Sequence, residues 1–209
     1  LDFDKQHSVR LMDIGESDYL SFSFNIGDCN VLPTDVLQPG YAIYVKRVYN
    51  SVEDTVLVIR DISGLAARYN DPANLASNSV DNGPYAPITR VWRRSQFEGN
   101  DLLGLTFDPR NREIYTATGV IYNNENFISN FAGTVDAKVY KISADGNTID
   151  ILATLPGNKG IGWIDIDTIH NQVYASNFDD GLIYVIPLSG GLNQTGPFIT
   201  YSIFLFIKI

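Results

Sequence analysis

The chain contains very few residues of the kinds that build covalent or reactive sites. It has one cysteine, one methionine and two histidines in 209 residues. A single cysteine excludes an intramolecular disulfide framework and any cysteine-cluster metal site. His7 lies near a chain end and His170 in a predicted turn, so no Ser-His-Asp constellation can be assembled around them. The lone Cys29 has no evident histidine partner, and we interpret it as a small, partly buried residue.

Basic residues are scarce as well. Fifteen Lys and Arg stand against 24 Asp and Glu, which gives a formal net charge of −9. Phosphate binding needs concentrated Lys and Arg, so this balance argues against a nucleic-acid or anionic-membrane partner. No run of 18 or more apolar residues exists, so the sequence predicts no membrane span. A hydrophobic content of 44% with 19% charged residues is typical of a globular chain.

Period-two alternation dominates the pattern of what is present. Residues 20–26 alternate apolar and polar side chains, and residues 41–49 and 55–62 are rich in β-branched and aromatic residues. These features predict strands. The composition then shifts to Asn, Asp, Ser, Pro and Gly, which is typical of a loop. We therefore expect a linker at 78–88, after a β-rich N-terminal region at 1–77.

The second half contains an internal repeat. In each unit an Asp is followed seven residues later by a Tyr, as in Asp108 with Tyr115 and Asp167 with Tyr174. With one residue of slack, Gly104 matches Gly162. A third strand and a fourth strand are expected after each pair. Their residues are 138–146 and 148–155 in the first unit, and 182–190 and 198–203 in the second.

Four short antiparallel strands per unit of about 40–60 residues are typical of propeller blades. The two matched glycines would lie in innermost strands, where the blades converge and leave no room for a Cβ atom. Two blades cannot close a ring, since propellers have at least about four. We therefore predict an all-β fold of β-propeller blades at 89–209, as an incomplete propeller. Its other blades would lie outside this chain or in another subunit.

The strand Gly104-Leu-Thr-Phe-Asp108 with Glu113-Ile-Tyr115, and the corresponding segment of 162–186, resemble NHL-type and gluconolactonase-like β-propeller repeats. The resemblance covers residues 102–190. It implies a divalent cation on the propeller axis, bound by Glu, Asn and Asp from inner strands, and such hard oxygen ligands suit Ca²⁺. The candidate ligands are Asp165, Asn177 and Asp179, with Asp101 and Asp180 as further acidic residues. The competing interpretation is that these side chains cap turns and loops.

An insertion at 119–135 distinguishes the first repeat unit from the second. Aromatic and amide side chains together suit the recognition of carbohydrate or protein, and long loops on a rigid scaffold often carry function. The alternative is a solvated insertion whose phenylalanines pack on the blade. The candidate ligand-binding residues are Tyr122, Asn124, Phe127, Asn130 and Phe131.

One basic segment stands out in this acidic chain. It contains Arg90, Trp92, Arg93 and Arg94. It could bind an acidic partner or a neighbouring subunit of the same protein. Alternatively, its arginines pair with local carboxylates while Trp92 packs in the core.

The leading functional hypothesis is a non-enzymatic protein that uses propeller blades for recognition or structure. Low Lys and Cys content, with many Asn, Asp, Gly and Tyr residues, favours an extracellular or cell-surface location. Its partners would be a protein or carbohydrate ligand, or other subunits of the same protein, and it would need no cofactor. A second hypothesis is a metal-dependent propeller hydrolase or lactonase with Ca²⁺. A third is a self-assembling surface or filament subunit that uses the apolar C-terminal strand and the arginine segment.

Overall fold

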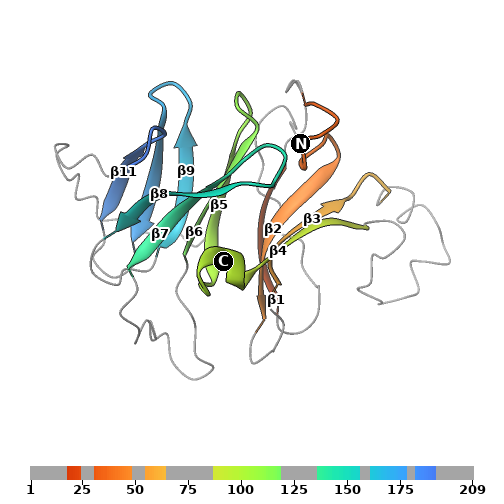
Figure 1. Ribbon diagram of the computed structural model, residues 1–209, viewed down its shortest axis with the longest axis horizontal. Coiled ribbons are helices and arrows are strands. Elements are labelled where there is room, and N and C mark those ends of the chain that lie inside the picture. Colours follow the sequence, from red (N-terminus) through yellow and green to blue (C-terminus); the bar gives the residue numbers. More distant parts are fainter. Residues whose placement is uncertain are drawn as a thin grey trace, which may run out of the picture.

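The computed structural model is all-β, and its strands form three antiparallel sheets (Figure 1). The structure describes residues 18–24, 31–48, 55–64, 87–118, 136–155, 161–177 and 182–191. In these residues the only helix is a short 3-10 turn, η1 (Arg94–Phe97). No helix in the described part of the chain is long and apolar enough to cross a membrane.

Each sheet is a simple meander in which strands adjacent in sequence are paired. The first sheet contains β1 (Asp18–Phe24), β2 (Tyr41–Val48), β3 (Thr55–Asp61) and β4 (Ile88–Arg93). The second contains β5 (Leu102–Asp108), β6 (Glu113–Thr118), β7 (Ala137–Ile142) and β8 (Ile149–Leu155). The third contains β9 (Ile161–Asp167), β10 (Gln172–Asn177) and β11 (Ile183–Pro187).

This architecture confirms the predicted all-β class, with propeller-like blades and no closed barrel among the described residues. The segments predicted as strands at 20–26, 41–49 and 55–62 correspond to β1, β2 and β3. β4 pairs with β3, so the first sheet takes strands from both sides of the segment at 78–88. The predicted fourth strand at 198–203 lies outside the described residues.

The second sheet lies between the other two, as the successive layers in Figure 1 show. Its strands alternate, so that one set of side chains packs on the first sheet and the other set on the third. The core shared with the first sheet includes Ile43, Leu57, Trp92, Phe107, Ile114 and Tyr140. The core shared with the third sheet includes Tyr115, Val139, Leu155, Ile164, Val173 and Ile186.

The strands of the two repeat units correspond residue by residue, without a gap. β5 and β9 both have seven residues, and a β-bulge interrupts their pairing with β6 and β10 at the same point. Counting from either end of these strands, Gly104 corresponds to Trp163, and Gly162 corresponds to Leu103. The expected match of Gly104 with Gly162 is therefore off by one residue, because the bulge adds its extra residue at the same place in both strands.

The turn after the third strand of a sheet packs on the fourth strand of the preceding sheet. Gly146 follows β7, and its carbonyl accepts a 3.2 Å hydrogen bond from the Trp92 indole of β4. Gly190 follows β11 in the same way, and the next residue, Gly191, donates a 2.8 Å backbone hydrogen bond to Leu152 of β8. Gly146 and Gly190 both have positive φ, at 71° and 92°. The two junctions between sheets therefore place equivalent turns on equivalent strands, although the hydrogen bonds that hold them differ.

These equivalent glycines give a matched test of inter-sheet packing. We expect Gly146→Ala to destabilise the fold more than Gly190→Ala, although both variants place a Cβ at positive φ. A Cβ at Gly146 would lie 2.8 Å from Val36 and 2.9 Å from Trp92, whereas one at Gly190 would lie 3.4 Å from the Leu152 carbonyl. The steric difference should be about 1–3 kcal/mol in the free energy of unfolding, measured by urea titration. Equal losses for the two variants would contradict this close packing.

Candidate functional site

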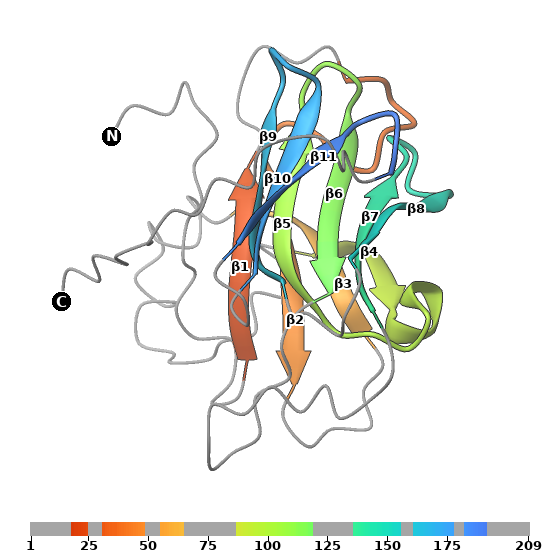
Figure 2. The ribbon, with the colours of Figure 1, turned by 90° about the vertical axis from the view of Figure 1, so that its left-hand side faces the viewer.

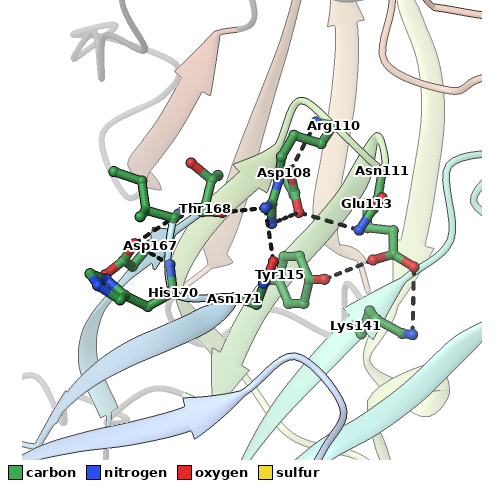
Figure 3. A network of polar contacts seen from close by, with 11 residues as sticks. Asp108, Arg110, Asn111, Glu113, Tyr115, Lys141, Asp167, Thr168, His170 and Asn171 are labelled. Atoms are coloured by element: carbon green, nitrogen blue, oxygen red, sulfur yellow. Dashed lines mark hydrogen bonds and ion pairs between the residues drawn. The ribbon is translucent and has the colours of Figure 1, made fainter.

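The densest polar network of the described residues lies where two equivalent turns meet (Figure 3). One turn joins β5 to β6 between Asp108 and Arg112, and the other joins β9 to β10 between Asp167 and Asn171. The fifth residue of each turn has a positive φ, 60° at Arg112 and 55° at Asn171. The two repeat units thus form the same type of turn, each opened by an Asp.

The Asp108 side chain is fully buried and accepts hydrogen bonds on both carboxylate oxygens. Oδ1 accepts from the backbone N–H of Arg110 at 2.9 Å and from its Nε at 3.0 Å, and Oδ2 accepts from Arg110 Nη2 at 2.9 Å. Asn111 Nδ2 adds a longer bond of 3.4 Å to Oδ2. The buried negative charge of Asp108 is therefore compensated, because the Arg110 guanidinium pairs with it and both carboxylate oxygens accept hydrogen bonds.

Arg110 carries the contact across to the third sheet. Its remaining nitrogen, Nη1, donates to the side-chain oxygen of Asn171 at 2.8 Å and to the Thr168 carbonyl. Hydrogen bonding to Asp108 raises the pKa of Arg110 above its ordinary value, so the guanidinium stays charged. A single side chain therefore links the buried carboxylate of one turn to the backbone and side chain of the next.

Asp167 organises its own turn but does not reach another sheet in the described structure. Its Oδ1 accepts from the backbone N–H groups of Ile169 and His170 at 2.9 and 3.0 Å, and its Oδ2 lies 2.6 Å from His170 Nδ1. These bonds, first the backbone one from His170, lower the pKa of Asp167 from 3.8 to about 2. The carboxylate is therefore ionised at neutral pH and fixes the shape of the turn.

A third carboxylate, that of Glu113, lies at the start of β6. Glu113 accepts a 2.7 Å hydrogen bond from the Tyr115 hydroxyl, and Lys141 Nζ lies 3.5 Å from its other oxygen. Burial raises the pKa of Tyr115, with the hydrogen bond to Glu113 adding to the shift. Tyr115 is thus a stable hydrogen-bond donor at any physiological pH. In the third sheet, Gln172 and Tyr174 repeat this pair with a 2.6 Å hydrogen bond from the amide to the hydroxyl.

The contacts of this network connect one repeat unit to the next. The buried carboxylate is paired, and the exposed His170 has its Nδ1 bound to Asp167. Within the described residues, no group of three or more His, Cys, Asp or Glu side chains could hold a metal ion. The network holds the edges of two sheets together rather than presenting a nucleophile beside a base.

The predicted cation ligands are placed only in part. Asp165 lies exposed on β9, where its Oδ1 accepts from the backbone N–H of Ile166 at 2.8 Å and from Thr106 Oγ1 at 3.4 Å. Asn177 ends β10 and pairs with Ile161, four residues before Asp165, so the two backbones lie about 13 Å apart along the strand. The structure does not bring these two residues together. Asp179 and Asp180 lie outside the described residues.

The arginine segment forms β4 and the start of η1. Arg90 donates to the Gly146 carbonyl at 2.9 Å, and its guanidinium lies 5.4 Å from the ring centroid of the fully buried Trp92. Arg94 forms a 2.7 Å ion pair with Asp101. Arg93 is exposed, and no ion pair joins it to a carboxylate in the described part of the chain. Only Arg93 of the predicted partner-binding arginines thus keeps its charge turned to solvent.

The five candidate ligand-binding residues in the 119–135 insertion lie outside the described residues, as do His7 and Cys29. Their predicted roles stay predictions. The structure does describe both ends of the insertion, which links β6 to β7. There Thr118, a buried residue, accepts a 2.9 Å hydrogen bond from the backbone N–H of Lys138. The base of the insertion is therefore fixed to the central sheet.

Sequence reasoning missed Arg110 as the residue that joins the two repeats. Its partners Thr168 and Asn171 lie about sixty residues further along the chain, and no local pattern connects them. The usable signal was the repeat itself, since equivalent turns of stacked units lie side by side. No protein-family model matches this chain, and a comparison with curated proteins finds no relative.

The turn network predicts unequal costs for equivalent substitutions. We expect Asp108→Ala to lower the free energy of unfolding by about 2–3 kcal/mol, because it removes four hydrogen bonds from a buried carboxylate and the anchor of Arg110. Asp167→Ala, at the equivalent position, should cost less, since its partners lie in its own exposed turn. Chemical denaturation of both variants measures the difference. A larger loss for Asp167→Ala would show that the Arg110 link does not matter.

The lowered pKa of Asp167 predicts an acid-sensitive contribution to stability. A carboxyl whose folded pKa is depressed stabilises the fold above its unfolded value of 3.8, and this contribution disappears as the pH falls towards about 2. The wild-type protein should therefore lose more stability between pH 4 and pH 2 than Asp167→Asn, which has no charge to lose. Unfolding curves at several pH values test this, and parallel losses in both proteins would refute it.

Proposed function

We propose that the chain is a non-enzymatic recognition protein of the cell surface or extracellular space, in which blade-like sheets hold a binding loop. The observation that supports this most directly is the placement of the 119–135 insertion. It follows Thr118 at the end of β6, in the sheet that is covered on both faces. A sheet covered on both faces holds the two described ends of the insertion, and loops attached to such a scaffold often carry binding residues.

The polar groups of the described site support the same proposal. Asp108, Arg110 and Glu113 are engaged in contacts that join strands and turns. A catalytic site needs polar groups aimed at a substrate, with a base within hydrogen-bond reach of a nucleophile. The contacts of these side chains are those of a scaffold. The ligand class that suits the aromatic and amide residues of the insertion is a carbohydrate or an extended peptide.

The test replaces the insertion by its shorter natural counterpart. In the third sheet, residues 178–181 connect equivalent strands, so grafting that sequence in place of 119–135 should keep the fold. The intact chain should bind members of an oligosaccharide array or a peptide array, and the grafted chain should bind at least about tenfold more weakly. Within the insertion, Phe127→Ala and Phe131→Ala should weaken binding while Ser129→Ala serves as the matched control.

Three results would count against the proposal. These are no binding on either array, equal binding by the grafted chain, or turnover of lactone or ester substrates that EDTA abolishes and Ca²⁺ restores. The last result would favour the metal-dependent hydrolase instead. Equal urea midpoints for the intact and grafted chains show that the comparison reports binding rather than unfolding.

A further inference from the structure

The third sheet has an outer face that the described structure leaves open. Figure 2 views the molecule from this side, with β9, β10 and β11 in front of the second sheet. Trp163 and Tyr174 lie on this face with 46% and 36% of their surfaces exposed. They alternate with Ile164 and Ala175, which are buried against the second sheet. Exposed aromatic residues gathered on one face are a mark of an interaction site.

The equivalent face of the second sheet shows what a further blade would require. There Gly104 stands at the position of Trp163, and a Cβ on it would lie 3.0 Å from the backbone nitrogen of Ile164. Tyr115, which corresponds to Tyr174, is fully buried under the third sheet. The indole of Trp163 therefore occupies the space through which the next inner strand would approach. A further sheet of the same kind cannot dock on the third sheet as the third docks on the second.

The turn of the third sheet also lacks the residue that joins one sheet to the next. Arg110, which binds Asn171 and the Thr168 carbonyl, corresponds to Ile169 in the β9–β10 turn. Ile169 is 83% exposed, and its apolar side chain cannot form the hydrogen bonds to a neighbouring turn that Arg110 forms. Two residues allow the third sheet to dock on the second, the small Gly104 and the bridging Arg110. At the equivalent positions the third sheet has the large exposed side chains of Trp163 and Ile169. The occupant of this face must be chemically different from another repeat.

Charge indicates which occupant fits. Residues 161–177 and 182–191 contain Asp165 and Asp167 but no Lys or Arg. Asp167 is bound to His170, whereas Asp165 is exposed, and its Oδ2 has no hydrogen-bond partner among the described residues. A partner with a cation beside an aliphatic group would pair with Asp165 and cover the aromatic rings at once.

The opposite end of the molecule presents such a surface. On β4, Val91 and Arg93 alternate with Arg90 and Trp92, which face the second sheet, so Val91 and Arg93 lie on the other side. Both are exposed, while Val58, which pairs with Val91 on β3, is buried. The open strip is therefore confined to the edge strand. It combines an aliphatic side chain with an arginine whose charge faces solvent.

We propose that the outer face of the third sheet binds the β4 strip of a second copy of this chain. Arg93 of the second copy lies over Trp163 and pairs with Asp165, while Val91 covers Tyr174. The chain already contains one such stack, in which the Arg90 guanidinium lies 5.4 Å from the Trp92 ring centroid. This association goes beyond the proposed ligand recognition, because it uses neither the 119–135 insertion nor its aromatic residues.

The two surfaces belong to opposite ends of the molecule, so the contact is heterologous and each copy can bind one neighbour at each end. The three-stranded face measures about 300 Å², from strand spacing and rise per residue. A contact this small gives weak, reversible association. We therefore expect a distribution of short oligomers that grows with concentration rather than a stable dimer.

Sedimentation velocity of the full chain over concentrations up to about 1 mM measures this association. Arg93→Glu and Asp165→Arg should each reduce the association constant at least about tenfold by placing like charges together. Their combination in one chain should restore it, and so should an equimolar mixture of the two single variants. Asp150→Arg, the same charge change at an exposed site on β8, is the matched control.

The control separates a local contact from an effect of overall charge. Asp165→Arg makes the net charge less negative, so general repulsion between copies falls, and a loss of association can come only from the contact itself. Trp163→Ala should also weaken association. Since Trp92 is fully buried, acrylamide quenching of fluorescence reports mainly on Trp163 and should decrease as copies associate.

Several outcomes would overturn the proposal. A wild-type chain that stays monomeric over the whole range leaves the face without a second copy. Association that stops at two copies indicates a symmetric contact instead. Equal effects of Asp165→Arg and Asp150→Arg, or no rescue by the combined charge reversals, would remove the Arg93–Asp165 pair from the interface. Loss with Trp163→Ala alone would assign the face to an uncharged apolar partner.

Discussion

The second sheet carries two buried faces, and the arrangement of the other sheets depends on that constraint. Successive residues of β6, such as Ile114 and Tyr115, point to opposite sides, and both are fully buried. A sheet of this kind is unstable in water unless both sides are covered, since each face exposes apolar area. The first sheet covers the face that contains Ile114, and the third covers the face that contains Tyr115. Consecutive residues of β2, such as Ile43 and Tyr44, are buried as well, whereas the third sheet exposes Trp163 and Tyr174 on its outer face, so the two ends of the stack differ.

Hydrogen bonds at the turns fix how the sheets are aligned once packing has brought them together. Apolar contact between two sheets is non-directional, so it does not by itself select one alignment. Arg110 adds direction, because its planar guanidinium must meet Asp108 on one side and Asn171 on the other. Trp92 does the same at the other joint through its bond to the Gly146 carbonyl. Each joint thus combines an apolar core with one polar contact that specifies the register of the sheets.

The sequence predicted those parts of the fold that depend on local pattern. Period-two alternation located β1, and runs rich in β-branched and aromatic residues located β2 and β3. The repeated Asp and Tyr located the strands of the second and third sheets. The equivalence of Gly104 and Trp163 was not predictable, because a β-bulge shifts pairing without leaving a sequence signal of its own. The internal role of Arg90 was likewise hidden, since its partner Gly146 is 56 residues away and packing alone brings them together. Contacts of this range depend on tertiary structure and have no local pattern.

The net charge of −9 argued against a nucleic-acid or anionic-membrane partner, but the charged residues are not spread evenly along the stack of sheets. The third sheet contains Asp165 and Asp167 and no basic residue in its described part, while β4 at the other end contains Arg90 and Arg93 and no acidic residue. Arginine on an edge strand normally prevents the strand from pairing with another sheet. Here one arginine is held against Trp92 and the other faces solvent, so protection of the edge requires only the second. The exposed charge of Arg93 opposes the addition of another strand along β4. The same charge can pair with a face that carries a carboxylate, so a polar edge can prevent one kind of assembly and permit another.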